Sequence, residues 1–225
     1  MAENESILEN KLIHELATGD SQWTYRPDLK TEDDLWNNIR EKLGNMNSHK
    51  LDGHPITDSE MEQIKSFIKE KAESTYKAAV WLSGERGLAQ IPLSREDASL
   101  GQLHLDAISN RDIAGGHSTY EIINQYQSRK QDDTDRNRRF DVTLLINGFP
   151  MIHIELKNQS HPYKEAFNQI KKYLTQGKFR GLFGLVQMFV VTNGVDTKYI
   201  AANDDPEKLN EKFLSTWVDK NNNPV

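Results

Sequence analysis

Residues 139–157 read RFDVTLLINGFPMIHIELK, and they are the most informative part of the sequence about the fold. Two apolar runs flank the dipeptide Asn147-Gly148, which favours a tight turn between antiparallel strands. One acid, Asp141, lies inside the first run, and the second run ends with Glu155-Leu156-Lys157. The pattern therefore predicts a β-hairpin that carries charged side chains among buried apolar ones.

Around this hairpin, strand-like and helical segments follow one another. Short apolar runs predict strands, and a spacing of three or four between apolar residues predicts helices. The expected strands cover residues 120–126, 139–146, 151–156, 186–192 and 198–202. The expected helices cover residues 7–16, 35–43, 58–68, 76–82, 164–174 and 207–218. Together they predict an α/β (α+β) fold with a mixed central sheet flanked by helices and a mostly helical N-terminal half.

The chain has 225 residues, a length that suits a single domain. Within it we expect residues 1–22 to form the first helix of the core and residues 23–117 to form a mostly helical elaboration. Residues 118–205 are expected to form the α/β core that carries the chemistry. Residues 206–225 are expected to form a terminal helix or a linker towards a further domain.

The composition excludes several kinds of chemistry. The chain has no Cys, which excludes disulfides, cysteine zinc sites, iron–sulfur clusters and thiol nucleophiles. No His-Glu-x-x-His or Gly-x-Ser-x-Gly pattern occurs, so neither a zinc hydrolase nor an elbow-type serine hydrolase is expected. No stretch approaches the roughly 20 apolar residues of a membrane helix, and the acidic start MAENESILEN is unlike a signal peptide. We therefore expect a cytoplasmic protein that has no membrane partner.

Basic residues gather on both sides of the hairpin. The net charge of −6 does not exclude a nucleic-acid partner, because binding depends on local patches. A solvated surface is the alternative interpretation of each cluster. The candidate DNA-binding residues are Arg136, Arg138, Arg139, Lys171, Lys172 and Arg180.

The acids of the hairpin suggest metal-dependent hydrolysis of phosphodiesters. Glu155 and Lys157 are two apart on a strand, so they share a face, and Asp141 comes from the partner strand. Carboxylates are hard oxygen ligands suited to Mg²⁺, which can activate a water and offset charge on the phosphate. The alternative is a salt-bridged sheet edge in which Lys157 only pairs with Glu155.

The register of the hairpin tests this interpretation. A strict two-residue turn would pair Ile146 with Phe149 and would turn the carboxylates of Asp141 and Glu155 to opposite faces of the sheet. A shared metal therefore requires Asp141 opposite Glu155, and we expect Ile146 opposite Pro150. An irregular connection from Asn147 to Pro150 would produce that offset, because Gly tolerates a bulge and Pro donates no ladder hydrogen bond.

Six segments of the sequence together match one known pattern. They are Glu9 to Ile13, Arg139 to Val142, Asn147 to Pro150, Ile154 to Lys157, Gln169 to Tyr173 and Val190 to Gly194. These segments resemble the N-terminal nuclease domain of type I restriction enzyme R subunits, which belongs to the RecB-like branch of the PD-(D/E)XK superfamily. The family's proline before the first aspartate is replaced here by Phe140, and no ATP-binding Gly-x-x-x-x-Gly-Lys-Ser/Thr loop occurs.

The resemblance implies a DNA endonuclease domain that uses Mg²⁺, with Mn²⁺ as a substitute. It implies double-stranded DNA as the substrate and, in the full-length enzyme, methyltransferase and specificity subunits as partners. ATP would act only through a motor domain that this chain lacks. The metal ligands would be Asp141 and Glu155, with Glu9 as a candidate third. The catalytic residues would be Asp141, Glu155, Lys157, Gln169 and Tyr173.

Simpler roles stay open for several of these residues. Gln169 and Tyr173 share a helix face that either borders the metal or only packs. Glu9 is either a ligand or a plain surface acid, and His153 either touches a phosphate or is a hydrogen-bonded structural residue. For the whole domain, the alternatives to nuclease activity are a catalytically idle DNA-binding module and a subunit-docking module.

Overall fold

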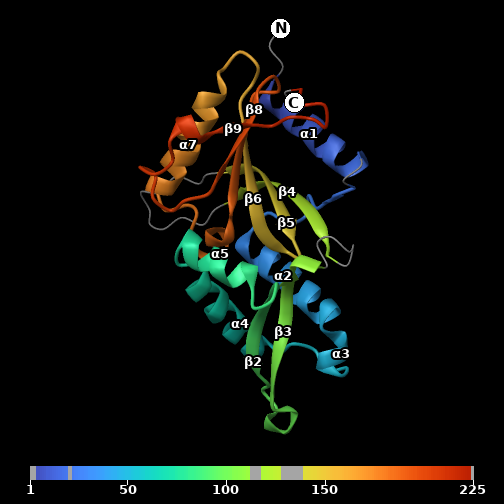
Figure 1. The fold of residues 1–225 in the computed structure, drawn as a ribbon. Coiled ribbons are helices and arrows are strands. Elements are labelled where there is room, and N and C mark those ends of the chain that lie inside the picture. Colours follow the sequence, from blue (N-terminus) through green and yellow to red (C-terminus); the bar gives the residue numbers. More distant parts are fainter. Residues whose placement is uncertain (1–3, 20–21, 112–117, 128–138, 224–225) are drawn as a thin grey trace.

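The computed structural model describes residues 4–19, 22–111, 118–127 and 139–223 (Figure 1). Its centre is a mixed seven-stranded sheet in the order β1-β4-β5-β6-β7-β8-β9. β1 joins β4 and β6 joins β7 in parallel, and the other neighbours are antiparallel. The strands are β1 (Thr24–Tyr25), β4 (Tyr120–Gln127), β5 (Arg139–Ile146), β6 (Phe149–Leu156), β7 (Met188–Thr192), β8 (Thr197–Ala201) and β9 (Ser215–Thr216).

Helices cover both faces of this sheet (Figure 1). On one face, α1 (Glu5–Thr18) packs Leu8 and Ile13 against a small core that includes Val142 and Ile154. On the opposite face, α7 (Tyr163–Thr175) and the 3-10 turn η2 (Gly181–Leu185) join a larger core. The expected mixed sheet flanked by helices is confirmed, and it is consistent with a PD-(D/E)XK-like nuclease fold.

The segment between α1 and the central strands contains the expected helices. Thr31 and Thr57 each form a capping box, which satisfies the free N–H groups of the first turn and explains where α2 and α4 begin. These helices bury apolar stripes in the larger core. The expected helices are α2 (Glu32–Met46), α4 (Asp58–Lys71) and α5 (Thr75–Ser83), and the short helix α3 (Ser48–Leu51) is an additional one that was not expected.

A two-stranded antiparallel ribbon was not among the expected elements. β2 (Leu88–Ser94) and β3 (Gln102–Ser109) form it, linked through the 3-10 turn η1 (Ala98–Leu100). In Figure 1 it extends away from the central sheet, with α4 beside it. Its inward-facing side chains alternate with exposed ones, which is the period-two pattern of a half-buried strand. Residues 23–117 therefore contain this ribbon in addition to the expected helices.

The hairpin has the expected offset, but by a different route. Ile146 pairs with Phe149 across a two-residue turn in which Asn147 and Gly148 have φ of 52° and 83°, typical of a regular hairpin turn. The expected pairing of Ile146 with Pro150 is therefore wrong. The extra residue lies one step further on, at Met151, because Leu145 pairs with Pro150 and Leu144 pairs with Ile152. This bulge restores the parity that the chemistry requires.

The expected C-terminal helix over residues 207–218 is also wrong. This segment forms the short 3-10 turn η3 (Glu211–Phe213) and then strand β9, which pairs with the edge of β8. Trp217 packs edge-on against Tyr199 of β8, with ring centroids 5.3 Å apart. Pairing with a free sheet edge satisfies backbone groups that an isolated short helix would hold only marginally. Among the described helices, none is both long enough and apolar enough to cross a membrane.

Candidate active site

Asp141 and Glu155 meet where β5 and β6 separate. The last ladder pair is Val142 with Ile154, and continuing this register places Asp141 opposite Glu155. The carboxylate of Asp141 takes the place of a ladder acceptor, because its Oδ2 accepts a hydrogen bond of 2.9 Å from the N–H of Leu156. The structure therefore brings together the two acids that the sequence singled out.

Glu155 is fully buried, and one of its oxygens is unsatisfied. Its Oε2 lies 3.1 Å from Nε2 of His153, and its Oε1 has no hydrogen-bond partner among the described residues. The Nζ of Lys157 is 4.0 Å from that same Oε1. A buried carboxylate oxygen without a donor is rare in folded proteins and calls for a cation or another group at this position.

Burial controls the charge of both acids. Burial raises the pKa of the Asp141 carboxyl, and the neighbouring Glu155 raises it further. Burial also raises the pKa of the Glu155 carboxyl, against the opposing attraction of Lys157. The pair therefore favours holding a proton, or a cation in its place.

His153 is a structural residue that supports Glu155. Its ring is fully buried, and it packs against Phe140, Phe179 and Phe189 with centroids 4.9, 5.2 and 6.5 Å away. Burial lowers the pKa of this imidazole to about 4, so it is neutral near pH 7. It cannot reach a phosphate in solvent, and the structural alternative is the one that holds.

Lys157 connects the hairpin to α1. Its Nζ donates a hydrogen bond of 2.9 Å to the carbonyl of Leu156 and lies 3.7 Å from Oε1 of Glu5. Glu5 did not appear among the sequence candidates. It lies four residues before Glu9 on the same helix, so the two share a face, and that spacing could have revealed it.

A cleft of about 530 Å³ opens beside Asp141 on the α1 side. Glu9 lines it, and each oxygen of its carboxylate accepts a hydrogen bond from a β4 amide, at 2.5 Å from Nδ2 of Asn124 and 2.6 Å from Nε2 of Gln125. Arg139, one of the candidate DNA-binding residues, lines the same cleft with an exposed side chain. Among the residues that the structure describes, no three His, Asp or Glu side chains are close enough to hold a metal ion. Glu9 as a third ligand therefore stays a prediction.

A second cleft, of about 370 Å³, lies between Lys157 and α7. Gln169 and Lys172 line it. The side chain of Gln169 donates a hydrogen bond of 2.7 Å to the hydroxyl of Tyr173, which in turn donates one of 3.4 Å to the carbonyl of Arg139. Tyr173 itself is buried and ties α7 to the start of β5. Gln169 thus lines the same cleft as Lys157, while the buried Tyr173 holds the side chain of Gln169 through their hydrogen bond.

The remaining basic candidates have different positions. Arg136 and Arg138 lie outside the described residues. Lys171 is half-buried on α7 and Arg180 is exposed after that helix. A role for either in binding DNA stays a prediction.

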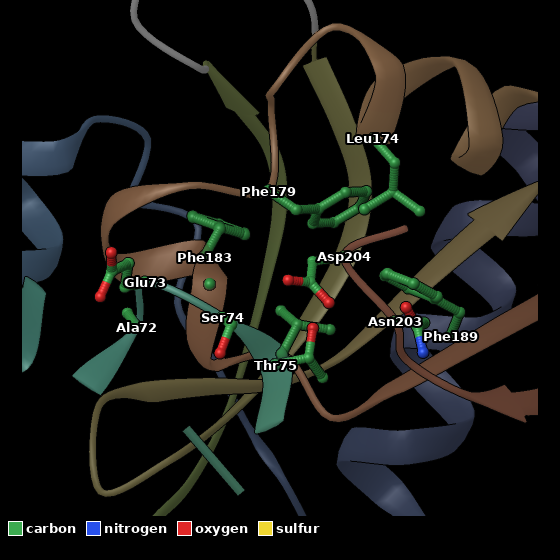
Figure 2. A pocket seen from close by; sticks show the side chains of 12 residues that line it. Ala72, Glu73, Ser74, Thr75, Leu174, Phe179, Phe183, Phe189, Asn203 and Asp204 are labelled. Atoms are coloured by element: carbon green, nitrogen blue, oxygen red, sulfur yellow. The ribbon is translucent and has the colours of Figure 1, made fainter. Parts of the chain in front are cut away.

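A small internal cavity lies away from the carboxylates. Figure 2 shows Phe179, Phe183 and Phe189 among the residues around it, together with Asn203 and Asp204. Its volume of about 20 Å³ has room for about one water molecule. It shares no lining residue with the two clefts, and neither Asp141 nor Glu155 lines it.

Comparisons with known proteins find relatives along nearly the whole chain. The family model described as the N terminus of the type I restriction enzyme R protein matches residues 2–208. The chain is 33% identical over 224 residues, 99% of its length, to the type I restriction enzyme SauCOLORF180P endonuclease subunit of Staphylococcus aureus (strain COL). It is 28% identical over 225 residues to the EcoprrI endonuclease subunit of Escherichia coli, where the match covers 98% of this chain.

The matched relatives extend beyond this chain. The match covers 22% of the staphylococcal subunit and 66% of the Escherichia coli subunit. The family model nevertheless spans β1 to β8 and both clefts. The chain therefore belongs to the type I restriction enzyme R protein N-terminus family.

Proposed function

We propose that this chain is the metal-dependent DNA endonuclease domain of a type I restriction enzyme R subunit. The observation that carries the proposal is the buried pair Asp141 and Glu155, with an unsatisfied oxygen on Glu155 and the ammonium of Lys157 4.0 Å from it. Relatives that match the whole chain are named as type I restriction endonuclease subunits, which supports the same chemistry.

The donor set fits a hard divalent cation. Both acids favour a bound cation because burial penalises their separate negative charges. Mg²⁺ keeps several waters and commonly binds through one or two carboxylates together with a substrate phosphate. Asp141 and Glu155 are therefore the residues that would hold it, and Mn²⁺ should replace it.

The chain's own residues then have distinct roles. Asp141 and Glu155 would orient the ion, which supplies charge neutralisation and an activated water when it is bound. Lys157 would place its ammonium beside the scissile phosphate, where it offsets the developing negative charge. Gln169 would hold the substrate or the attacking water from the α7 side, with Tyr173 fixing its amide.

The expected substrate path runs over both clefts. Arg139 lines one cleft and Lys172 lines the other, so a DNA backbone lying across the carboxylates would meet a positive side chain on each side. The methyltransferase and specificity subunits, and ATP acting through a motor domain, would contribute in the longer protein. A catalytically idle DNA-binding module is the second candidate, because Lys157 also forms the salt bridges of a structural edge.

Plasmid nicking separates these candidates. We expect the chain to nick supercoiled DNA with Mn²⁺ or Mg²⁺, and Asp141→Asn and Lys157→Met to abolish nicking. Lys69→Met on the exposed face of α4 is the matched control and should nick at the wild-type rate. Cleavage by Lys157→Met at the wild-type rate would overturn the assignment. DNA binding without metal binding or nicking would favour the idle module.

A further inference from the structure

Gln125 has an unusual backbone conformation inside a strand. Its φ is +53°, in the left-handed region that residues other than Gly, Asn and Asp rarely adopt. Asn147 also has a positive φ, but it lies in a hairpin turn that requires one. Strained backbone of this kind persists only when its surroundings hold it, and it gathers at functional sites.

This residue lies directly beside the candidate active site. Asn124 pairs with Val142 and Tyr126 pairs with Phe140, so the register places Gln125 opposite Asp141. Asp141 thus has Gln125 across from it on β4 and Glu155 across from it on β6. Gln125 also lines the same cleft as Asp141.

The left-handed residue changes which way the β4 side chains point. In a regular strand, residues an odd number apart point to opposite faces. Ile123 and Tyr126 are three apart, yet both belong to the larger core. The face alternation therefore shifts by one residue between them. This shift lets neighbouring amides, from Asn124 and Gln125, reach the same carboxylate of Glu9 on the α1 side.

A matching shift occurs in β5. Phe140 belongs to the larger core and Val142 to the small core under α1, although they are two apart and would share a face in a regular strand. The residue between them is Asp141, which lines the α1-side cleft. The two shifts face each other across the β4–β5 ladder. The direction of the Asp141 carboxylate is therefore coupled to the conformation of Gln125.

We propose that Gln125 is a positioning residue, and that its hydrogen bond to Glu9 holds the left-handed step that aims Asp141 into the cleft. We call the two hydrogen bonds from Asn124 and Gln125 of β4 to the carboxylate of Glu9 on α1 the clamp. The inference rests on the proposed role of Asp141 as a metal ligand. It assigns Glu9 a supporting task that does not depend on direct contact with the ion.

Divalent-metal affinity tests the proposal independently of cleavage. In calorimetric titrations with Mn²⁺, we expect Gln125→Ala to weaken binding about tenfold, as is typical when a group that orients a metal ligand is removed. Gln125→Gly removes the same amide without backbone strain, so it keeps the test available if the alanine variant folds poorly. It should weaken Mn²⁺ binding less than Gln125→Ala does, because Gly adopts the left-handed conformation at little cost.

Gln90 supplies a matched control. Its amide also donates to a carboxylate, that of Asp106, at 2.7 Å, and it also lies on a strand, but in the β2–β3 ribbon. Gln90→Ala should lose comparable stability in urea and bind Mn²⁺ with wild-type affinity. A Gln125→Ala protein that loses stability and keeps wild-type Mn²⁺ affinity would show a merely structural role and would overturn the inference.

The outcomes also separate this inference from the proposed function. If Asp141→Asn loses Mn²⁺ binding while both Gln125 variants keep it, only the positioning role fails. If the wild-type protein binds no Mn²⁺, the proposed function fails, and the inference fails with it. A double variant, Glu9→Gln with Gln125→Ala, should weaken Mn²⁺ binding no more than Gln125→Ala alone, because both changes break one clamp.

Discussion

Replacing Asp141 with Asn should stabilise the metal-free protein at neutral and alkaline pH. The wild-type site holds two buried acids whose ionisation is unfavourable without a cation. Asn keeps an oxygen to accept the hydrogen bond from the N–H of Leu156, and its amide can donate to the unsatisfied oxygen of Glu155. The variant should therefore gain stability while it loses the ability to hold a cation.

The magnitude follows from the pKa of Asp141. Burial, together with Glu155, raises this pKa from 3.8 to about 7. Between these values the folded protein binds a proton that the unfolded chain does not, so the Asp141 contribution to stability is lost as pH rises from about 4 to about 7. A shift of this size corresponds to about 4 kcal/mol at most, and sharing of the proton with Glu155 reduces the expected effect to about 2 to 4 kcal/mol above pH 7.

The measurement is the free energy of unfolding in urea, in buffer containing EDTA, at several pH values from 5 to 8.5. His153 contributes with the opposite sign, since burial lowers its pKa to about 4 and its stability contribution grows as pH rises towards 6.5. The informative quantity is therefore the difference between Asp141→Asn and wild type, in which only the part of the His153 contribution that depends on the Asp141 charge remains. This difference should increase as pH rises. Asp196→Asn, at an exposed position in the β7–β8 turn, is the control and should show a flat difference. An equally flat difference for Asp141→Asn would refute the electrostatic argument.

Three further predictions test the surroundings of the site and the packing of the N-terminal half. His153→Leu removes the hydrogen bond to the buried site carboxylate, and calorimetry should show about tenfold weaker Mn²⁺ binding; an unchanged affinity would mean that other contacts hold the ligand. Arg95→Met leaves the buried carboxylate of Glu60 without its 2.7 Å partner and should cost about 3 kcal/mol in urea unfolding, with a loss below about 1 kcal/mol contradicting this. Gly84→Ala should destabilise strongly, because its Cβ would lie 2.2 Å from main-chain carbon at φ +63°, whereas Gly44→Ala, inside α2 with no atom within 4 Å, should gain about 1 kcal/mol.

Parts of the site could be predicted because they depend on local patterns. The acids of β5 and β6 and the following lysine stand out, since charged residues at the ends of apolar strands need a partner. The Gln169 and Tyr173 pair follows from helical spacing, and the structure shows their side chains in contact. Glu5 and Gln125 were missed, because their place in the site depends on how α1 packs and on one unusual φ angle.

The hairpin, most of the central strands and helices, and the family follow from residue type and spacing along short stretches of the chain. The register at Met151 depends instead on contacts between distant segments, because the main-chain carbonyl of Met151 accepts a hydrogen bond from the N–H of Gln187 and the bulge there resets the parity of β6. The tertiary structure also explains why the C-terminal segment forms strand β9, because this segment pairs with the free edge of β8. The direction of Asp141 belongs to this second class. It is set by the left-handed Gln125 on the neighbouring strand β4 and by the carboxylate of Glu9, which lies more than a hundred residues earlier in the chain. Such long-range contacts leave no periodic pattern in the sequence.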